Sequence, residues 1–511
     1  MLARVRSAAV LGVDAYPVDV EVDIASGLPS FATVGLPQAA VRESRERVGA
    51  ALANAGFALP LRRIVVNLAP ADVPKSGTAF DLPIALAVLA ASGQLPAERL
   101  ASAVIVGELG LEGDLRPVRG VLPIALAARA AGADTVIVPA ANAAEAAVVG
   151  EVRALGAASL AEVCAHVRGE VELVRGVACT DGPARSLDHG LDFADVRSQG
   201  AAKRGLEVAA AGAHNALLVG PPGSGKTMLA RRLPTILPAP TLEESLETTK
   251  IHSVAGLLPP GRGLVTGRPF RAPHHTISDA GLVGGGSHPR PGEVSLAHGG
   301  VLFLDELPEF RRSVLEVLRQ PLEDGMVSLS RASRSITFPA RFMLAAAMNP
   351  CPCGYLGDGG QACRCTVDAI ARYRARLSGP LLDRIDIHLD VPAVSYSDLA
   401  VSGPASSSAD IRARVEAARR RQRRRFAGRT GVHANAHMGP RDLRRYCRVG
   451  AAGESLLREA ITRLGLSARA YHRVLKIART IADLADAGDI GVAHVAEAIQ
   501  YRSLDRKRLA A

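Results

Sequence analysis

The sequence predicts a multidomain α/β chain that ends in a helical domain, and three observations support this fold class. At 511 residues the chain is too long for one ordinary hydrophobic core. Strand-like and helical patterns of apolar residues alternate through most of the chain, and only helical patterns remain near its end. Hydrophobic residues make up 48% and charged residues 22%, as in globular proteins. We expect α/β domains at 1–165 and 193–395, linkers at 166–192 and 396–410, and a helical domain at 411–511.

The first expected domain is mixed, with helices packed on a sheet. Residues 18–24 alternate strictly between apolar and acidic, as a strand with one solvated face does. A helix is predicted over 38–55, because Pro37 precedes it and Gly56 follows it. The other predicted elements are strands at 64–68, 104–109 and 135–138 and helices at 82–89 and 141–149.

A glycine-rich loop between a strand and a helix is the strongest local motif. Residues 216–229 read ALLVGPPGSGKTML, an apolar strand followed by a GxxxxGK[ST] loop and the start of a helix. Glycines let the main chain curl so that several N–H groups converge on a phosphate. Lys226 would reach the β and γ phosphates, and Thr227 would hold Mg²⁺. The motif predicts ATP or GTP binding by Gly220, Pro221, Pro222, Gly223, Ser224, Gly225, Lys226 and Thr227.

Two later apolar runs end in polar residues that suit the same site. Residues 300–304 predict a buried parallel strand that ends at Asp305 and Glu306. The carboxyl ends of parallel strands form the ligand crevice of an open α/β sheet. Asp305 is therefore placed to hold Mg²⁺ through water, and Glu306 to polarise the attacking water. The run 342–348 ends at Asn349, whose amide would orient that water or, alternatively, only cap a turn.

Charge and hydropathy limit the function classes. No uncharged run approaches the roughly 20 apolar residues that cross a bilayer, and the N-terminus has no signal-peptide core. We therefore expect a soluble cytoplasmic protein without membrane partners. The formal charge is +11, and from Arg412 to Arg429 there are nine arginines and a single acid, Glu416. This stretch is either a solvated helix face or a surface for a polyanion, and a nucleotide-driven motor in the same chain favours nucleic acid.

Four of the seven cysteines form a C-x-C-x9-C-x-C cluster. Two short knuckles joined by a glycine-rich connector can close tetrahedrally around Zn²⁺, although C-x-C is tighter than the usual C-x2-C. Free thiols, disulfides or another cluster are the alternatives. The candidate zinc ligands are Cys351, Cys353, Cys363 and Cys365.

A polar turn between alternating segments predicts a hairpin at 324–338. Arg331 and Arg334 lie at its turn and would meet DNA phosphates, with ordinary solvation as the equal alternative. His274 and His275 have no carboxylate or cysteine at metal spacing nearby in sequence, which favours a structural role.

The order and spacing of these motifs resemble the magnesium-chelatase-like AAA+ ATPases of the ComM/YifB type. The resemblance spans nearly the whole chain. It is carried by FRAPHHT at 270–276, GPPGSGKT at 220–227, VLFLDE at 301–306, AAMNPCPCG at 346–354 and SGPLLDRIDIHLDVP at 378–392.

The resemblance implies an architecture, an assembly and further site residues. It implies a Lon-protease-like (S5-type) α+β N-terminal domain, an AAA+ P-loop α/β core and a helical C-terminal lid, assembled as a homo-hexamer. Asn349 is similar to the sensor-1 residue. Arg384 resembles the arginine finger of a neighbouring subunit, the alternative being a salt bridge with a nearby aspartate. Arg469 matches the sensor-2 arginine, and Arg473 is the alternative on the same helix face.

The resemblance to Lon-type proteases does not extend to their catalytic pair. Ala79 stands where the serine nucleophile is expected, and Leu122 where the lysine is expected. Lys75 with Ser76 or Thr78 is a poor substitute, because near-adjacent loop residues seldom converge. We expect no protease activity.

The function expected from the resemblance is ATP hydrolysis coupled to DNA remodelling, as helicase or branch migration during recombination of incoming DNA. The expected cofactors are ATP and Mg²⁺, with Zn²⁺ in the cysteine cluster, and the expected partner is single-stranded or branched DNA. The alternatives are a magnesium chelatase ATPase subunit and a protein remodeller. A porphyrin substrate is disfavoured, because the resemblance to that subunit is expected to cover only the ATPase core.

Overall fold

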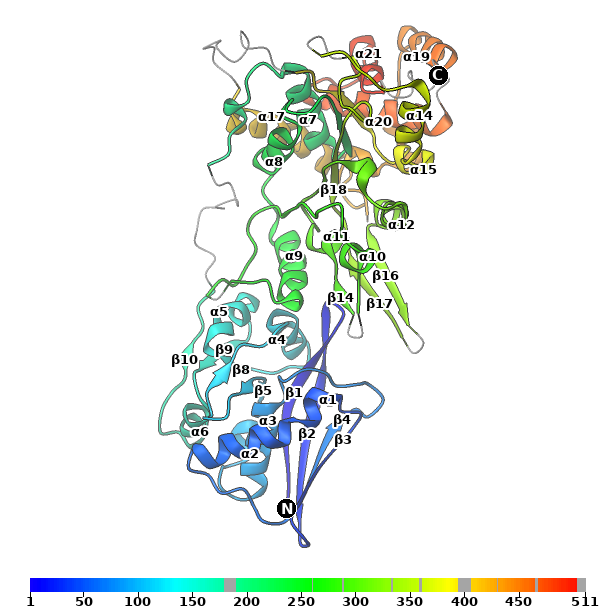
Figure 1. Cartoon of the computed structure of the whole chain (residues 1–511). Coiled ribbons are helices and arrows are strands. Elements are labelled where there is room, and N and C mark those ends of the chain that lie inside the picture. The colour runs from blue at the N-terminus through cyan, green and yellow to red at the C-terminus, as the bar shows by residue number, and fades with distance from the viewer. Residues whose placement is uncertain are drawn as a thin grey trace.

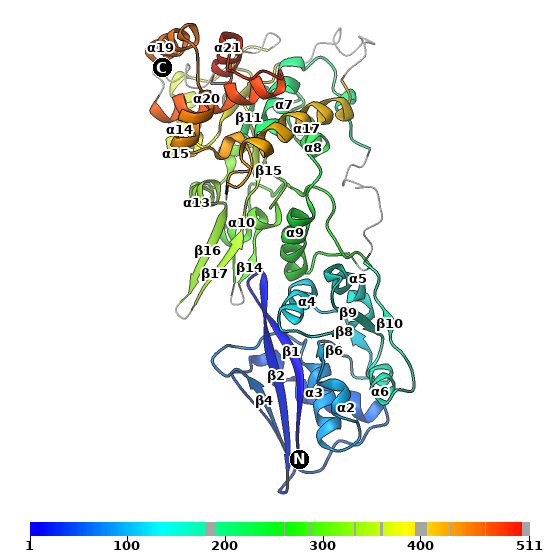
Figure 2. The same ribbon diagram turned by 180° about the vertical axis from the view of Figure 1, so that it is seen from behind.

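The computed structural model describes residues 1–178, 190–259, 261–286, 289–331, 334–357, 361–393, 406–429, 431–464 and 467–502. Figures 1 and 2 show an elongated molecule, with an N-terminal α/β body at one end and the C-terminal helices at the other. Much of both expected linkers, 179–189 and 394–405, lies outside the described residues. The domain boundaries therefore stay predictions, whereas the mixed α/β architecture with a helical C-terminal region is confirmed.

The N-terminal body contains an eight-stranded mixed sheet of order β10-β9-β8-β5-β1-β2-β4-β3. Strand β2 includes the alternating segment 18–24, and its apolar side chains Val18, Val20, Val22 and Ile24 are buried. The strands are β1 (Leu2–Leu11), β2 (Asp14–Ala25), β3 (Ser30–Val34), β4 (Arg63–Ala69), β5 (Ala103–Ile105), β8 (Thr135–Pro139), β9 (Arg153–Ala157) and β10 (Val174–Arg175), with a separate β6 (Glu108–Leu109) and β7 (Leu115–Arg116) hairpin. The helices are α1 (Ala39–Arg42), α2 (Ser44–Asn54), α3 (Asp81–Ala91), α4 (Val121–Ala130), α5 (Ala143–Ala146) and α6 (Leu160–Arg168).

The second sheet is parallel and has the order β12-β15-β18-β11-β19. Its strands are β12 (Phe270–Arg271), β15 (Val301–Leu304), β18 (Met343–Met348), β11 (Ala216–Val219) and β19 (Ile387–Asp390). The predicted strands before the glycine-rich loop, before Asp305 and before Asn349 are thereby confirmed. Because all five strands run in one direction, their carboxyl ends lie at one edge, where the candidate site residues follow.

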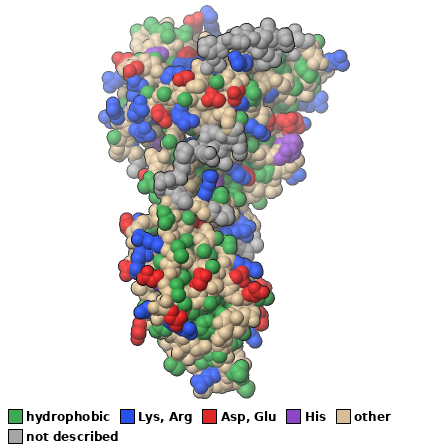
Figure 3. All heavy atoms as spheres, turned by 90° about the vertical axis from the view of Figure 1, so that its left-hand side faces the viewer, with side chains coloured by type: hydrophobic (Ala, Val, Ile, Leu, Met, Phe, Trp, Pro, Cys, Tyr) green, Lys and Arg blue, Asp and Glu red, His purple; other side chains and the backbone are tan. Residues whose placement is uncertain are grey.

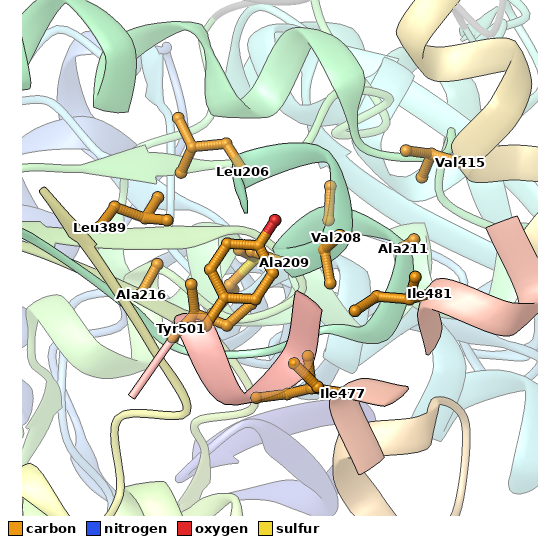
Figure 4. Packing of buried hydrophobic residues seen from close by; sticks show 14 of the residues in the cluster. Leu206, Val208, Ala209, Ala211, Ala216, Leu389, Val415, Ile477, Ile481 and Tyr501 are labelled. Atoms are coloured by element: carbon orange, nitrogen blue, oxygen red, sulfur yellow. The ribbon is translucent and has the colours of Figure 1, made fainter. Parts of the chain in front are cut away.

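Alternate residues of these strands enter two separate hydrophobic cores, one on each face of the sheet. Ala216 and Leu218 of β11 belong to one core, and Leu217 and Val219 to the other. Figure 4 shows the first core, where helix α7 (Gly200–Gly212) and strand residues Ala216 and Leu389 meet side chains of the C-terminal helices. The sheet and the helical region therefore share one core.

Helices and two hairpins surround the parallel sheet. The helices are α8 (Lys226–Ile236), α9 (Leu242–Ala255), α10 (Asp279–Val283), α11 (Glu293–Leu296), α12 (Arg312–Val317), α13 (Arg319–Asp324), α14 (Val367–Ala375) and α15 (Gly379–Leu382). The hairpins are β13 (Gly284–Gly285) with β14 (Arg290–Pro291), and β16 (Met326–Arg331) with β17 (Arg334–Pro339), and the second confirms the hairpin predicted at 324–338. The C-terminal helices are α17 (Ser408–Arg425), α18 (Pro440–Tyr446), α19 (Ala451–Leu464), α20 (Ala468–Leu484) and α21 (Val492–Gln500).

Helix α9 lies between the N-terminal body and the parallel sheet (Figure 1). The Ser253 hydroxyl donates to the buried carboxylate of Glu145, and the Gly120 N–H donates to the Ser253 carbonyl at 3.2 Å. Lys250 forms an ion pair with Asp14 at 2.9 Å. The N-terminal body is therefore held against α9 by specific polar contacts.

Candidate functional site

The glycine-rich loop leaves the tip of β11 and enters α8 as predicted. Gly223 and Gly225 have φ values of 76° and 88°, a left-handed conformation that favours glycine. Gly220 packs so closely on the end of β19 that an added Cβ would lie 2.0 Å from the Val391 carbonyl oxygen. The loop therefore has the local glycine requirements of a phosphate cradle, and α8 begins directly after it.

Lys226 lies buried beneath this loop. Its ammonium donates to the carbonyls of Gly220 at 2.8 Å and Pro221 at 2.7 Å, and lies 3.3 Å from Asn349 Oδ1. Burial lowers the pKa of Lys226, and the charges of Asp305 and Glu306 oppose that shift. The lysine, the amide and the loop are therefore brought together as the sequence predicted.

Asp305 joins the loop to the acidic end of β15. Thr227 Oγ1 donates to Asp305 Oδ2 at 2.6 Å, and the Glu306 N–H donates to Asp305 Oδ1 at 3.0 Å. Glu306 has a φ of 52°, rare for a residue with a side chain, and its side chain is 58% exposed. A hydroxyl and a carboxylate at hydrogen-bonding distance beside a phosphate-binding loop are the donors that Mg²⁺ takes, so the residues fit the metal that the motif implies.

His275 lies at this site although the sequence analysis favoured a structural role for it. Its Nδ1 is 3.5 Å from Glu306 Oε2, and its ring lies against that of His274, with centroids 4.1 Å apart and an angle of 33° between the ring planes. The sequence analysis considered only residues near His275 along the chain, and the structure places the distant Glu306 carboxylate beside it. Strand β12 pairs in parallel with β15, so the segment after β12 reaches the same sheet edge as Glu306. Only the pairing of these strands could have revealed the contact.

Arg384 is turned inward in the single chain. Its side chain is 9% exposed, forms an ion pair with Glu323 and donates to the Pro380 carbonyl at 2.6 Å. It lines a cavity of about 480 Å³ together with Glu316 and Asp324. The sequence alternative of a salt bridge with a neighbouring aspartate named the wrong partner, because the acid comes from α13. The arginine-finger role stays a prediction that requires this side chain to leave Glu323.

The two sensor-2 candidates differ in their surroundings. Arg469, at the start of α20, is exposed. Arg473, one turn on, forms an ion pair with Asp386, whose other carboxylate oxygen lies 2.9 Å from His214 Nδ1. Arg473 therefore links α20 to the segment that carries Arg384, whereas Arg469 faces outward, as a residue available to a ligand would.

The four clustered cysteines converge in space. Their sulfur atoms all lie within 4.8 Å of one another, and Cys351 is buried. None of these four cysteines forms a disulfide, so the disulfide alternative is not seen. The other two cysteines among the described residues, Cys164 and Cys447, are isolated and buried, as packing residues are.

The candidate nucleic-acid contacts are the arginines of the β16–β17 hairpin and those of α17, and their surroundings differ. Arg331 and Arg334 pair across the tip of the β16–β17 hairpin, and their side chains lie outside what the structure describes. Figure 3, in which the left-hand side of Figure 1 faces the viewer, shows Lys and Arg side chains gathered along the upper left edge of the molecule. Most arginines of α17 are bonded within the chain, so the two alternatives from the sequence, a solvated face and a polyanion surface, concern mainly the exposed arginines of this helix. Those bonded internally are Arg412, Arg414, Arg419, Arg421 and Arg425, and those exposed on the same helix include Arg420, Arg423 and Arg424.

Ala79 and Leu122, which the sequence analysis compared with a Lon-type catalytic pair, lie in one apolar cluster. Leu122 is fully buried, and Ala79 packs against the same cluster. Lys75 is also buried, and its ammonium donates to the Pro70 carbonyl.

Comparison with known proteins gives matches over nearly the whole chain. Family models described as "Magnesium chelatase, subunit ChlI", "Subunit ChlI of Mg-chelatase" and "Magnesium chelatase, subunit ChlI C-terminal" match residues 192–399, 20–142 and 405–502. These matches correct the expectation that the resemblance to a chelatase subunit covers only the ATPase core.

Similar full-length proteins include two called uncharacterized protein YifB and one called competence protein ComM. The YifB proteins of Escherichia coli and Salmonella typhimurium are each 46% identical over 506 residues, covering 99% of this chain and 98% of theirs. The ComM protein of Haemophilus influenzae is 46% identical over 508 residues, covering 99% of this chain and 98% of its own. Among the described residues, no helix is both long and apolar enough to cross a membrane.

Proposed function

The chain belongs to the magnesium-chelatase-like AAA+ ATPase family that contains YifB and ComM, and from that premise we propose that it couples ATP hydrolysis to DNA remodelling. The observation that carries the ATPase part is the convergence of Lys226, Thr227, Asp305 and Asn349 at one edge of a parallel sheet. Support for the DNA part comes from the relative named a competence protein and from the arginine-bearing hairpin. Remodelling would take the form of strand separation or branch migration during recombination of incoming DNA.

Each residue of the site has a distinct task in this proposal. Bound Mg²⁺ supplies charge that stabilises the transferring phosphoryl group. The loop from Gly220 to Thr227 holds the phosphates with its N–H groups, and Lys226 exchanges its carbonyl partners for phosphate oxygens. Thr227 and Asp305 would hold the metal, which their 2.6 Å contact preorganises. Glu306 accepts the proton of the attacking water.

The position of Glu306 supports its part in this scheme. Its side chain is 58% exposed, its backbone N–H donates to Asp305, and His275 Nδ1 lies 3.5 Å from its carboxylate. Asn349, one residue beyond β18, would orient the attacking water from the neighbouring strand tip. Arg469 would contact the γ-phosphate from the C-terminal helices, with Arg473 as the alternative.

The catalytic arginine is proposed to act between subunits of a homo-hexamer. Arg384 points at its own Glu323, so within one chain it does not reach the glycine-rich loop. A neighbouring subunit that draws this arginine onto its phosphates would make hydrolysis depend on assembly. Closed rings with repeated head-to-tail interfaces allow every site to be completed in this way.

The DNA contacts are proposed to be made by arginines with phosphates. The β16–β17 hairpin carries Arg331 and Arg334 at its tip and projects away from the parallel sheet (Figure 1). Contacts of this kind are independent of sequence and weaken as salt rises. We propose further that the cysteine cluster holds Zn²⁺, and that the N-terminal body is a docking or oligomerisation module without protease activity.

ATPase stimulation tests this function. Steady-state ATP hydrolysis is measured alone, with single-stranded DNA, with a branched duplex and with an unfolded polypeptide. Stimulation by DNA that is lost at high salt supports the proposal, and a Lys226→Ala variant should lose turnover under every condition. Stimulation by unfolded polypeptide alone would replace it with a protein-remodelling function.

The family descriptions favour one second candidate, an ATPase subunit of a magnesium chelatase. That function needs partner subunits and a porphyrin, and it gives no role to the cysteine cluster. Magnesium insertion into a porphyrin, assayed with chelatase partner subunits, is expected to be absent. Insertion that requires Lys226 would favour the chelatase instead.

A further inference from the structure

The cysteine cluster lies directly beside the glycine-rich loop. The Gly220 N–H donates to the Met348 carbonyl at 3.3 Å, and the next residue, Asn349, lies 3.3 Å from Lys226 Nζ. The first cysteine, Cys351, follows two residues later and is fully buried. The chain thus passes from the phosphate site into the cluster within three residues.

A glycine of the cluster packs on the centre of the phosphate loop. Gly354 has a φ of 89°, and a Cβ added to it would lie 2.5 Å from Pro222 Cδ and 2.8 Å from Pro222 Cγ. Atoms do not approach that closely, and the proline ring has no freedom to rotate away. A side chain at position 354, or a shift of Gly354 towards Pro222, would therefore displace the loop around Pro222.

The sulfur positions suit a tetrahedral metal. The Cys351 and Cys353 sulfurs are 3.3 Å apart, and each lies 3.6 Å from the sulfur of Cys363. Four thiolates at about 2.3 Å from Zn²⁺ would be about 3.8 Å from one another. The N–H of Cys353 also donates to the sulfur of Cys365 at 3.4 Å, a bond that stabilises thiolate ligands.

We infer that Zn²⁺ in this cluster braces the phosphate loop through the contact of Gly354 with Pro222, so that nucleotide affinity depends on the metal. The inference rests on the proposed ATPase function and adds a control over its nucleotide site. Without a metal, thiolates repel one another and neutral thiols have no shared ligand to hold them together. The segment from Cys351 to Gly354 then loses its fixed position.

The test measures zinc and nucleotide affinity separately on the purified full-length protein. Zinc per chain is obtained by elemental analysis, and the dissociation constant by titration with a fluorescent ATP analogue. Gly354→Ala retains every thiol but places a methyl group against Pro222. Gly357→Ala is the matched control, because Gly357 has a φ of 80° and an added Cβ would meet nothing within 4 Å.

Wild-type protein is expected to hold one zinc per chain. Gly354→Ala should keep that zinc and bind the analogue about tenfold more weakly, the usual order for an overpacked contact, while Gly357→Ala stays within about twofold of wild type. A double variant, Cys363→Ser with Cys365→Ser, should lose both the zinc and the affinity. Lys226→Ala should lose nucleotide and keep zinc.

Two results would overturn the inference alone: zinc-free wild-type protein that still binds the analogue, or equal affinities for Gly354→Ala and Gly357→Ala. Wild-type protein that holds zinc but binds no nucleotide would overturn the proposed function along with the brace. Gly354→Ala leaves the thiols intact, so it tests the contact with Pro222 even if the cysteine variant fails to fold, while the zinc content and affinity of the wild-type protein test the dependence on the metal.

Discussion

Two inactive variants are expected to restore each other's activity if Arg384 acts on a neighbouring subunit. Arg384→Ala removes the arginine, and Lys226→Ala disables the phosphate loop, so each variant alone should hydrolyse ATP about 10³-fold or more slowly than wild type. In a ring assembled from equal amounts of both, an interface works when an intact loop meets an intact arginine. About one quarter of interfaces satisfy that condition if mixing is random.

The structure also indicates that moving Arg384 away from Glu323 and Pro380 costs less free energy than the arginine is expected to contribute to catalysis. Its partner Glu323 is 56% exposed, so we assign the ion pair the range of exposed pairs, up to about 1 kcal/mol. The hydrogen bond to the Pro380 carbonyl adds about 1 kcal/mol. A 10³-fold rate effect corresponds to about 4 kcal/mol, so assembly can draw the arginine away. Glu323→Gln should therefore change the rate by less than about tenfold and should not abolish it.

The assay is steady-state ATP hydrolysis at fixed total protein while the ratio of the two variants is varied. The rate is expected to peak near equal amounts, at about one quarter of the wild-type rate per subunit. Sedimentation of the mixture confirms that mixed rings form. A flat, inactive profile in mixed rings would refute the action of Arg384 between subunits.

Three further predictions concern the metal ligand, the lysine and the hairpin. Asp305→Asn keeps the shape of the side chain but removes the charge beside Thr227, so kcat should fall about 10- to 100-fold, and a Mg²⁺ titration showing unchanged activity would count against the assignment. Burial lowers the pKa of Lys226, so its ammonium is lost at a lower pH than that of an exposed lysine, and nucleotide affinity should weaken as pH rises. Titrations across alkaline pH should show this for wild type and not for Lys226→Arg, whose side chain stays charged; equal pH profiles would contradict it. Replacing both Arg331 and Arg334 with Gln should weaken DNA binding and flatten its dependence on log salt by about two units of slope, with basal ATPase activity retained.

The parts of the site that adjoin a strand tip could be predicted from sequence. The loop at 220–227 and the acids at 305 and 306 are local motifs, and parallel pairing brings strand ends together wherever the strands lie in the sheet. The hairpin at 324–338 was equally local, since its alternation and polar turn are read within fifteen residues.

Contacts between distant segments could not be predicted in this way. His275 meets Glu306 only because β12 lies beside β15, and Arg384 contacts Glu323, which is 61 residues away in sequence, through an ion pair that no spacing reveals. The arginines of α17 look alike in sequence, yet helix geometry turns Arg419 inward and Arg420 outward. Side-chain direction on a helix depends on which face the rest of the fold covers.

Strand separation by the assembled protein tests the central claim most directly. A forked DNA duplex with one labelled strand is incubated with protein and ATP, with protein and a non-hydrolysable ATP analogue, and with Lys226→Ala protein and ATP. Displacement or branch migration is expected only in the first reaction and should fall as salt rises. A protein that hydrolyses ATP but leaves forked and branched DNA unchanged in all three reactions would contradict the account.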